Sequence, residues 1–227
     1  MKYSDKVTPL EAYQNESCDL FELKEKKKEI YETITSAVGA EDPVIRERIE
    51  TYFDYFSDEF ARADILAGKY QTRYLNASVT IYALSAIAVM AIAAQYIFHL
   101  PHMVGGIEVG AMVIILLILL YGNKVGWHRR WLDYRFLAER LRYGLNVAVL
   151  VGKGSADVEK SLALRWVGES WCLSYFQQIW QARPKSEPVE GADLENLKDQ
   201  LDKTWLNDQL GFHERKHKRA SDRHKLI

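Results

Sequence analysis

The pattern of apolar and polar positions changes abruptly in the middle of the chain. Residues 74–107 carry no charged side chain, and a second uncharged block, Val109–Asn123, follows the single carboxylate of Glu108. A helix that crosses a bilayer core of about 30 Å needs about 20 apolar residues, and its backbone groups must be paired internally. We therefore predict transmembrane helices at about residues 76–98 and 105–124. The second reaches full length only if Glu108 or Lys124 lies at headgroup level.

The segment around Pro101 and the Gly105-Gly106 pair predicts a short turn, so the two spans should form a hairpin. Lys and Arg near membrane ends set orientation. The connecting loop has neither residue, whereas both flanks of the hairpin do. The flanking residues are Arg62, Lys69 and Arg73 before the first span and Lys124, Arg129, Arg130 and Arg135 after the second. We predict a multi-pass protein of the inner (cytoplasmic) membrane with both termini cytoplasmic.

Long apolar runs also occur in signal peptides and in the cores of soluble proteins. A signal peptide is excluded here because the run starts far from the N-terminus, behind a polar segment. A hairpin buried in a soluble domain remains an alternative, which the length, the flanks and the charge asymmetry all disfavour.

The polar arms have helical patterns. Apolar residues recur at helical spacing over residues 20–38, Gly39 ends that pattern, and Asp42-Pro43 suits the cap and first turn of a new helix. That helix runs toward the first span, although Gly68 weakens the prediction of continuity. Further helices are predicted at about 127–150, 156–182 and 193–227. The predicted class is all-α, with residues 1–59 as N-terminal cytoplasmic helices and 60–227 as a second domain.

Composition adds limits. The chain has 227 residues and a net charge of −1, so charge alone indicates no class of partner. Cys18 and Cys172 are the only cysteines, which indicates neither a disulfide framework nor a cysteine-based metal site.

The sequence from His213 to His217 matches the zinc-protease motif H-E-x-x-H. The match is weak, because Arg215 and Lys216 would place cations beside the metal and the residues after His217 offer only Asp222 and His224 as a third ligand. We predict no metal, cofactor or enzymatic activity. The basic C-terminal end is either a solvated helix or a surface for anionic headgroups, and no nucleic-acid reading element is evident.

The helix after the second span carries the most distinctive polar pattern. Glu139 lies at helix-neighbour spacing from two arginines, and the small Ala138 permits close approach of another helix. We favour a buried or interfacial polar cluster over a surface ladder of ion pairs. Its predicted members are Trp131, Tyr134, Arg135, Ala138, Glu139 and Arg142.

Within the spans, small residues share one face of the first helix and would let the second span or another subunit pack closely. These are Ala83, Ala86, Ala93 and Ala94. Glu108 is the only carboxylate near the bilayer, and such residues are functional candidates. Its predicted place at the outer interface makes snorkelling an equally good interpretation.

A two-helix hairpin followed at once by W-L-x-Y-R-x-x-A-E-x-L-R resembles the SLATT family, the SMODS- and SLOG-associated two-transmembrane effector domains of prokaryotic conflict systems. Residues 63–74 (ADILAGKYQTRY) resemble the family's lead-in to its first span. A C-terminal element also resembles the family's W-x-x-x-Q-x-x-[YF]-H pattern, and it comprises Trp205, Gln209, Phe212 and His213. The resemblance covers about residues 60–227 and accounts for His213 without zinc.

The resemblance implies a membrane effector of a nucleotide-triggered antiviral system rather than an enzyme, acting by pore formation. Because two helices cannot enclose a water path, a pore requires a homo-oligomer. Its partners would be membrane lipids and a nucleotide-sensing or nucleotide-synthesising protein, although residues 1–73 have no Gly-rich phosphate loop. The alternative is a non-conducting anchor or scaffold that binds a partner through its cytoplasmic helices. Leu226-Ile227 follows no helix stop signal, so we also expect a longer polypeptide.

Overall fold

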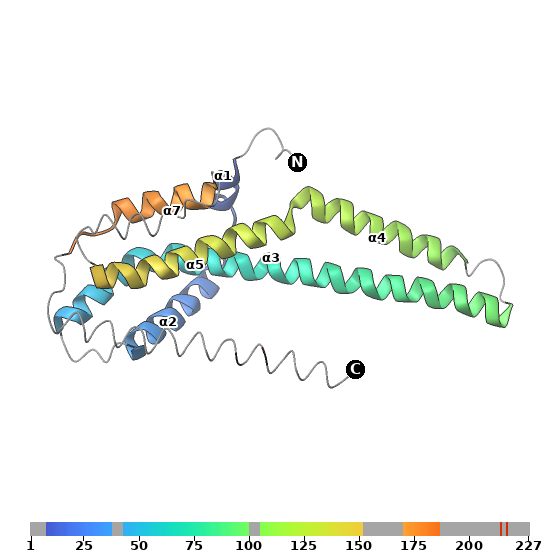
Figure 1. Ribbon diagram of the computed structural model, residues 1–227, viewed down its shortest axis with the longest axis horizontal. Coiled ribbons are helices and arrows are strands. Elements are labelled where there is room, and N and C mark those ends of the chain that lie inside the picture. The colour runs from blue at the N-terminus through green and yellow to red at the C-terminus, as the bar shows by residue number, and fades with distance from the viewer. Residues whose placement is uncertain are drawn as a thin grey trace. The chain divides into compact units, whose positions relative to one another are not determined.

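The computed structural model describes residues 8–37, 43–99, 105–151 and 170–186, together with Glu214 and His217. Of these residues 91% are helical and none is in a strand, which confirms the all-α prediction. The helices, drawn in Figure 1, are α1 (Pro9–Gln14), α2 (Leu20–Ala37), α3 (Pro43–Phe98), α4 (Gly105–Val125), α5 (Trp127–Val151) and α7 (Trp171–Ala182).

The observed helix bounds agree with the predicted ones along most of the described chain. The first span ends at Phe98, and the second occupies Gly105–Val125, one residue longer than predicted. Gly68 does not interrupt α3, where a methyl group added to this glycine would meet nothing within 4 Å. The helix predicted over 156–182 is described only from Trp171 onward, and nearly all of the one predicted over 193–227 lies outside the described residues.

Helix α1 was not predicted, although the sequence contains its start signal. The backbone N–H of Glu11 donates to the Thr8 hydroxyl at 3.2 Å, and the N–H of Thr8 donates to the Glu11 carboxylate at 2.8 Å. This reciprocal capping box satisfies two donors that a helix start leaves unpaired, and Pro9 has none to lose at the first helical position. A helix of 6 residues nevertheless has too few apolar positions to produce a periodic pattern.

The chain divides into two compact units. The first comprises Met1–Arg62 and Leu137–Ile227, and the second comprises Ala63–Phe136. Helices α3 and α5 each contribute residues to both units.

In the first unit, α2 lies antiparallel to the N-terminal part of α3. Lys27 forms an ion pair with Asp58 at 2.7 Å, and the rings of Tyr31 and Phe53 meet edge to face at 5.1 Å. Helices α1, α5 and α7 complete an aromatic core. Its fully buried large side chains are Tyr13, Ile49, Tyr52, Phe56, Leu137, Leu141, Leu145 and Phe176.

One glycine sets the spacing of two helices in this core. A methyl group on Gly144 of α5 would lie 2.9 Å from the Phe176 ring of α7, closer than carbon atoms pack. The Tyr55 hydroxyl of α3 also donates to the Ile179 carbonyl of α7, at 2.9 Å. The absent side chain at Gly144 is therefore what lets the Phe176 ring lie against the α5 backbone.

In the second unit, α4 returns alongside the C-terminal part of α3, with Gly105 next to the Gln95 side chain (Figure 1). Among the described residues, two helices are long and apolar enough, by length and composition, to cross a membrane. With a rise of 1.5 Å per residue, the 21 residues of α4 extend about 32 Å, close to the thickness of a bilayer core.

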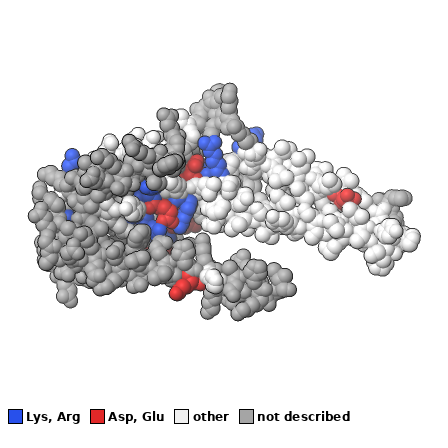
Figure 2. Space-filling view, viewed as in Figure 1, with Lys and Arg blue, Asp and Glu red and all other residues white. Residues whose placement is uncertain are grey.

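The outward side chains of this hairpin are large, apolar and exposed, including Tyr96 at 85% and Leu117 at 60%. Figure 2 shows a nearly unbroken surface without charge over α4 and the adjoining part of α3, and Lys and Arg gather where that surface ends. A contiguous apolar surface of this kind marks a site of contact with lipid or protein.

Candidate functional site

The backbone changes direction at Gly126, where the apolar helix passes into the charged one. Gly126 has φ +71°, a left-handed conformation that costs other residues about 1 kcal/mol or more. Its N–H donates to the Gly122 carbonyl at 2.8 Å, which closes the last turn of α4. The Trp127 ring then lies 3.1 Å from the place where Gly122 would carry a Cβ. Two glycines thus end the apolar helix and allow a tryptophan to fold against it.

Just beyond this turn, two arginines converge on one tyrosine of α3. Arg130 donates to the Tyr70 hydroxyl at 2.7 Å and its guanidinium lies 5.4 Å from the Tyr70 ring centre. Arg73 lies 5.5 Å from the centre of the same ring. Tyr134 packs edge to face against Tyr70 at 5.6 Å, which fixes the ring between the two helices. Two cations of different helices thus contact the same buried tyrosine.

A second aromatic group lies one turn further along α3, at Tyr74. Its ring stacks on Trp131 at 5.8 Å and lies 4.8 Å from the His128 ring. Tyr74 and Trp131 are half-buried, and His128 is exposed. Tyr and Trp are the side chains enriched at membrane–water interfaces, where one end of the ring is apolar and the other is solvated. This group therefore suits the boundary at which it lies, between the uncharged hairpin and the charged part of α5.

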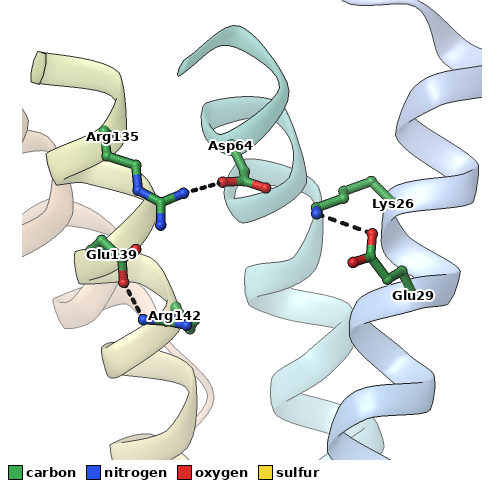
Figure 3. Close-up of polar contacts among 6 residues, drawn as sticks. All are labelled: Lys26, Glu29, Asp64, Arg135, Glu139 and Arg142. Atoms are coloured by element: carbon green, nitrogen blue, oxygen red, sulfur yellow. Dashed lines mark hydrogen bonds and ion pairs between the residues drawn. The ribbon is translucent and has the colours of Figure 1, made fainter. Parts of the chain in front are cut away.

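Of the polar cluster predicted on α5, Tyr134 and Ala138 are buried, at 2% and 0% exposure, and Trp131 is half-buried. Arg135 forms an ion pair with Asp64 of α3 at 2.8 Å, and Glu139 pairs with Arg142, as Figure 3 shows. The partner of Arg135 was missed, because Asp64 is 71 residues away in the sequence. The role predicted for these residues in subunit contacts stays a prediction.

The predicted alanine face points away from α4. Ala83, Ala86 and Ala93 are exposed and Ala94 is half-buried. The small residues buried in the hairpin are instead Ala88, at 8% exposure, and Ala111 of α4, at 5%. The second span is therefore not the partner of Ala83, Ala86 and Ala93. Another subunit, the other partner predicted for this face, stays a prediction. Ile81, Leu84, Ala88 and Ala91, which are buried or half-buried, also recur at 3-4 spacing, but a span without charged residues has no polar face that singles this spacing out in the sequence.

Glu108 lies in the first turn of α4 and is half-buried. The backbone N–H groups at a helix start favour a negative charge, so this place suits a carboxylate. Lys124 occupies the last turn of the same helix, where a cation is favoured. Helix α4 thus contains one charged residue near each end, and the placement of either at headgroup level stays a prediction.

The C-terminal element falls largely outside the described residues. This applies to Trp205, Gln209, Phe212 and His213, and only Glu214 and His217 of the H-E-x-x-H motif are described, both helical and exposed. Among the described residues, no group of three or more His, Cys, Asp or Glu side chains could hold a metal ion.

The sequence pattern also did not reveal a half-buried polar contact between α1, α3 and α7. The Tyr13 hydroxyl donates to the Glu59 carboxylate at 3.1 Å, and the Tyr13 ring packs against Trp171 and Tyr175 of α7. Burial raises the pKa of Tyr13 strongly, and burial together with the Glu59 charge raises the pKa of Tyr175 to about 12. Both phenols are therefore neutral near pH 7.

Arg62 holds the C-terminal end of α1 in place. Its guanidinium donates to the carbonyls of Tyr13, Gln14 and Glu16 at 2.6–3.0 Å, and it lies 5.1 Å from the Tyr13 ring centre. Carbonyl groups at a helix end have no partner within the helix, and a cation is favoured there. This contact anchors the helix that the sequence pattern did not reveal.

No protein-family model, curated protein or solved structure matches the chain. The resemblance to the SLATT family therefore rests on the residues that carry it.

Proposed function

We propose that this protein is a multi-pass protein of the cytoplasmic membrane, with its hairpin across the bilayer and both termini in the cytoplasm. The length of α4 and the uncharged, exposed surface of the hairpin support insertion. The hydroxyl groups of Ser78, Thr80 and Ser85 each donate to a carbonyl one turn back at 2.9 Å, which satisfies them without water. The orientation follows from the Lys and Arg residues, which flank the hairpin at its open end.

Within the membrane, we propose that the protein is an effector that acts by forming an oligomeric pore. Two helices cannot surround a water path, so several copies must contribute. The outward position of Ala83, Ala86 and Ala93 carries this proposal, because small residues on an exposed face let helices of neighbouring copies approach closely. The nucleotide trigger and the role in antiviral defence follow from the SLATT resemblance alone.

The alternative, a non-conducting anchor or scaffold, is favoured by a different observation. The outward surface of α4 is lined with residues that suit lipid, such as Ile114, Leu117 and Leu120. The hydroxyl groups of the first span are also turned back to their own helix. A chain of this kind holds the aromatic bundle of the first unit at the membrane, where that bundle would bind a partner protein.

Induced expression in bacteria with a potential-sensitive dye tests the proposal. Wild type is expected to depolarise the cells, and Ala86→Trp is expected not to, because the indole would keep neighbouring helices apart. Ile92→Trp is the matched control. Ile92 is 47% exposed on the same helix and faces about a third of a turn away from Ala86, so its replacement should leave depolarisation intact.

Extraction of membranes with alkaline carbonate must accompany this measurement. Release of the chain from the membranes would contradict insertion itself. Retention with an unchanged potential, even with the triggering nucleotide system co-expressed, would contradict the pore and leave the anchor. Equal loss of depolarisation in both tryptophan variants would show that the alanine face is not a specific contact.

A further inference from the structure

The chain segments at the open end of the hairpin carry an excess of positive charge. Residues 69–74 of α3 and 124–134 of the α4–α5 turn contain five cations and one carboxylate, Asp133. We call the five cations the basic collar, and they are Lys69, Arg73, Lys124, Arg129 and Arg130. Asp133 lies 3.9 Å from Arg129, and one carboxylate cannot neutralise five cations. The collar is therefore positive whatever pairs form within it.

The collar is also held in a defined arrangement. Arg73 and Arg130 both lie against the Tyr70 ring, at 5.5 and 5.4 Å from its centre, so one buried ring positions two cations. An anion near these guanidinium groups would be attracted to both of them. Arg also offers paired donors that match the oxygens of a phosphate group.

The position of the collar at the end of the uncharged hairpin indicates that the anion is the phosphate group of a lipid. The uncharged stretch of α3 starts at Tyr74, directly after Arg73, and that of α4 ends at Asn123, directly before Lys124. The half-buried rings of Tyr74 and Trp131 stack on each other where that uncharged stretch of α3 starts. A bilayer around the hairpin would therefore have its phosphate groups at the level of the collar.

We propose that the basic collar is a binding site for the phosphate headgroup of an anionic phospholipid of the cytoplasmic leaflet. Arg73 and Lys124, which are both exposed, contact the phosphate. Arg130 completes the positive field from its place on Tyr70. The proposal of this site rests on the proposed insertion of the hairpin. It goes beyond insertion because it assigns recognition of the lipid charge to named residues.

The proposal is tested with the purified full chain in a zwitterionic detergent. Short-chain phosphatidylglycerol is added, and the rise in melting temperature is followed over a range of lipid concentrations to obtain an apparent affinity. Phosphatidylcholine with the same acyl chains and inorganic phosphate are measured in parallel. Because each cation near a lipid surface contributes about 1 kcal/mol, each charge removed should weaken binding about five-fold.

The test variant is Arg73→Gln with Lys124→Gln, which removes two exposed collar charges. The matched control is Lys28→Gln with Arg46→Gln, which removes two exposed cations that belong to the first unit. Arg73→Lys with Lys124→Arg keeps the charge and should keep the affinity. Wild type and both control variants are expected to bind phosphatidylglycerol alike, and the test variant is expected to lose about 25-fold in affinity.

Equal stabilisation by phosphatidylcholine would overturn the proposal, because it would show acyl-chain solvation without headgroup recognition. So would unchanged phosphatidylglycerol binding in the test variant, or a response to inorganic phosphate as strong as that to the lipid. Carbonate extraction from membranes distinguishes the absence of headgroup recognition from a failure of the hairpin to insert. A chain that stays in the membrane but shows no headgroup preference contradicts the collar site alone.

Discussion

The two compact units place similar side chains in opposite surroundings. In the first unit, Tyr52, Phe56 and Leu141 are all 0% exposed, whereas in the second unit Tyr96 and Leu117 are 85% and 60% exposed. The first unit contains charged residues throughout its helices, and the hairpin of the second contains Glu108 alone between Arg73 and Lys124. The first unit buries these groups against each other, and the hairpin of the second unit presents them to its surroundings. This difference supports the proposal that the hairpin is surrounded by hydrocarbon and the first unit by water.

The largest expected effect on stability comes from replacing one apolar residue in each unit by alanine. Phe56→Ala should lower the free energy of unfolding by about 3–5 kcal/mol, because it opens a cavity in a closed core. Leu117→Ala should change it by no more than about 0.5 kcal/mol in detergent, because most of its side chain faces outward and its loss leaves no closed cavity. Thermal unfolding in mild detergent measures both. Similar losses at the two positions would show that the outward face of α4 is covered by protein.

Two glycines in long helices give a smaller contrast. Gly144→Ala should destabilise by about 1–3 kcal/mol, because the added methyl group would overlap the Phe176 ring. Gly68→Ala should instead stabilise by about 0.5–1 kcal/mol, because the site is open and alanine favours the helix. Chemical unfolding of the two variants and wild type decides between them. A stabilised Gly144→Ala variant would contradict the close contact of α5 and α7.

The turn between α4 and α5 gives a third test. Gly126→Ala should destabilise by about 1 kcal/mol, because a residue with a Cβ adopts φ +71° only with strain. Gly106→Ala is a matched control in α4, where an added methyl group would meet nothing within 4 Å and φ is not positive. Thermal unfolding of the variants compares them. An unchanged Gly126→Ala variant would mean that the two helices can join without the left-handed turn.

The smallest effect expected is one of pH, and it sharpens the comparison because it belongs to the first unit alone. Burial raises the pKa of Tyr175 to about 12, and raises that of Tyr13 as well, while an unfolded tyrosine titrates near 10. The unfolded chain therefore loses these protons first, so stability is complete below about pH 10 and falls between about pH 10 and 12. At pH 10.5 only a modest loss is expected.

Unfolding at pH 8 and pH 10.5 measures this loss, and Tyr175→Phe should reduce the difference between the two values. Tyr82→Phe, at an exposed tyrosine of the hairpin, is the control and should leave the difference unchanged. A variant at Tyr175 that responds to pH as wild type does would contradict the burial of its hydroxyl.

The sequence predicted the parts of the fold that depend on long stretches of chain. The absence of charge over many consecutive residues indicates where the hairpin lies in the chain, and Pro101 with the Gly105-Gly106 pair indicates where its helices end and begin. Gly68 was given too much weight, since one glycine costs a helix only about 1 kcal/mol and 56 helical residues outweigh it.

The sequence could not show which side chains contact each other when they are far apart in the chain. Asp64 pairs with Arg135, and Tyr13 meets Tyr175, across separations that no helical repeat encodes. The alanine face was identified as a face, but periodicity alone did not tell which side of α3 meets α4. That choice depends on Ala88 and Ala111 lying opposite the exposed stripe, and it required the structure.

Helix α3 is continuous, whereas α4 and α5 are two separate helices. Helix α3 runs from Pro43 to Phe98 without a break, whereas its neighbours α4 and α5 are separated at Gly126. An unbroken helix keeps one direction from end to end, whereas the left-handed backbone at Gly126 gives α4 and α5 different directions.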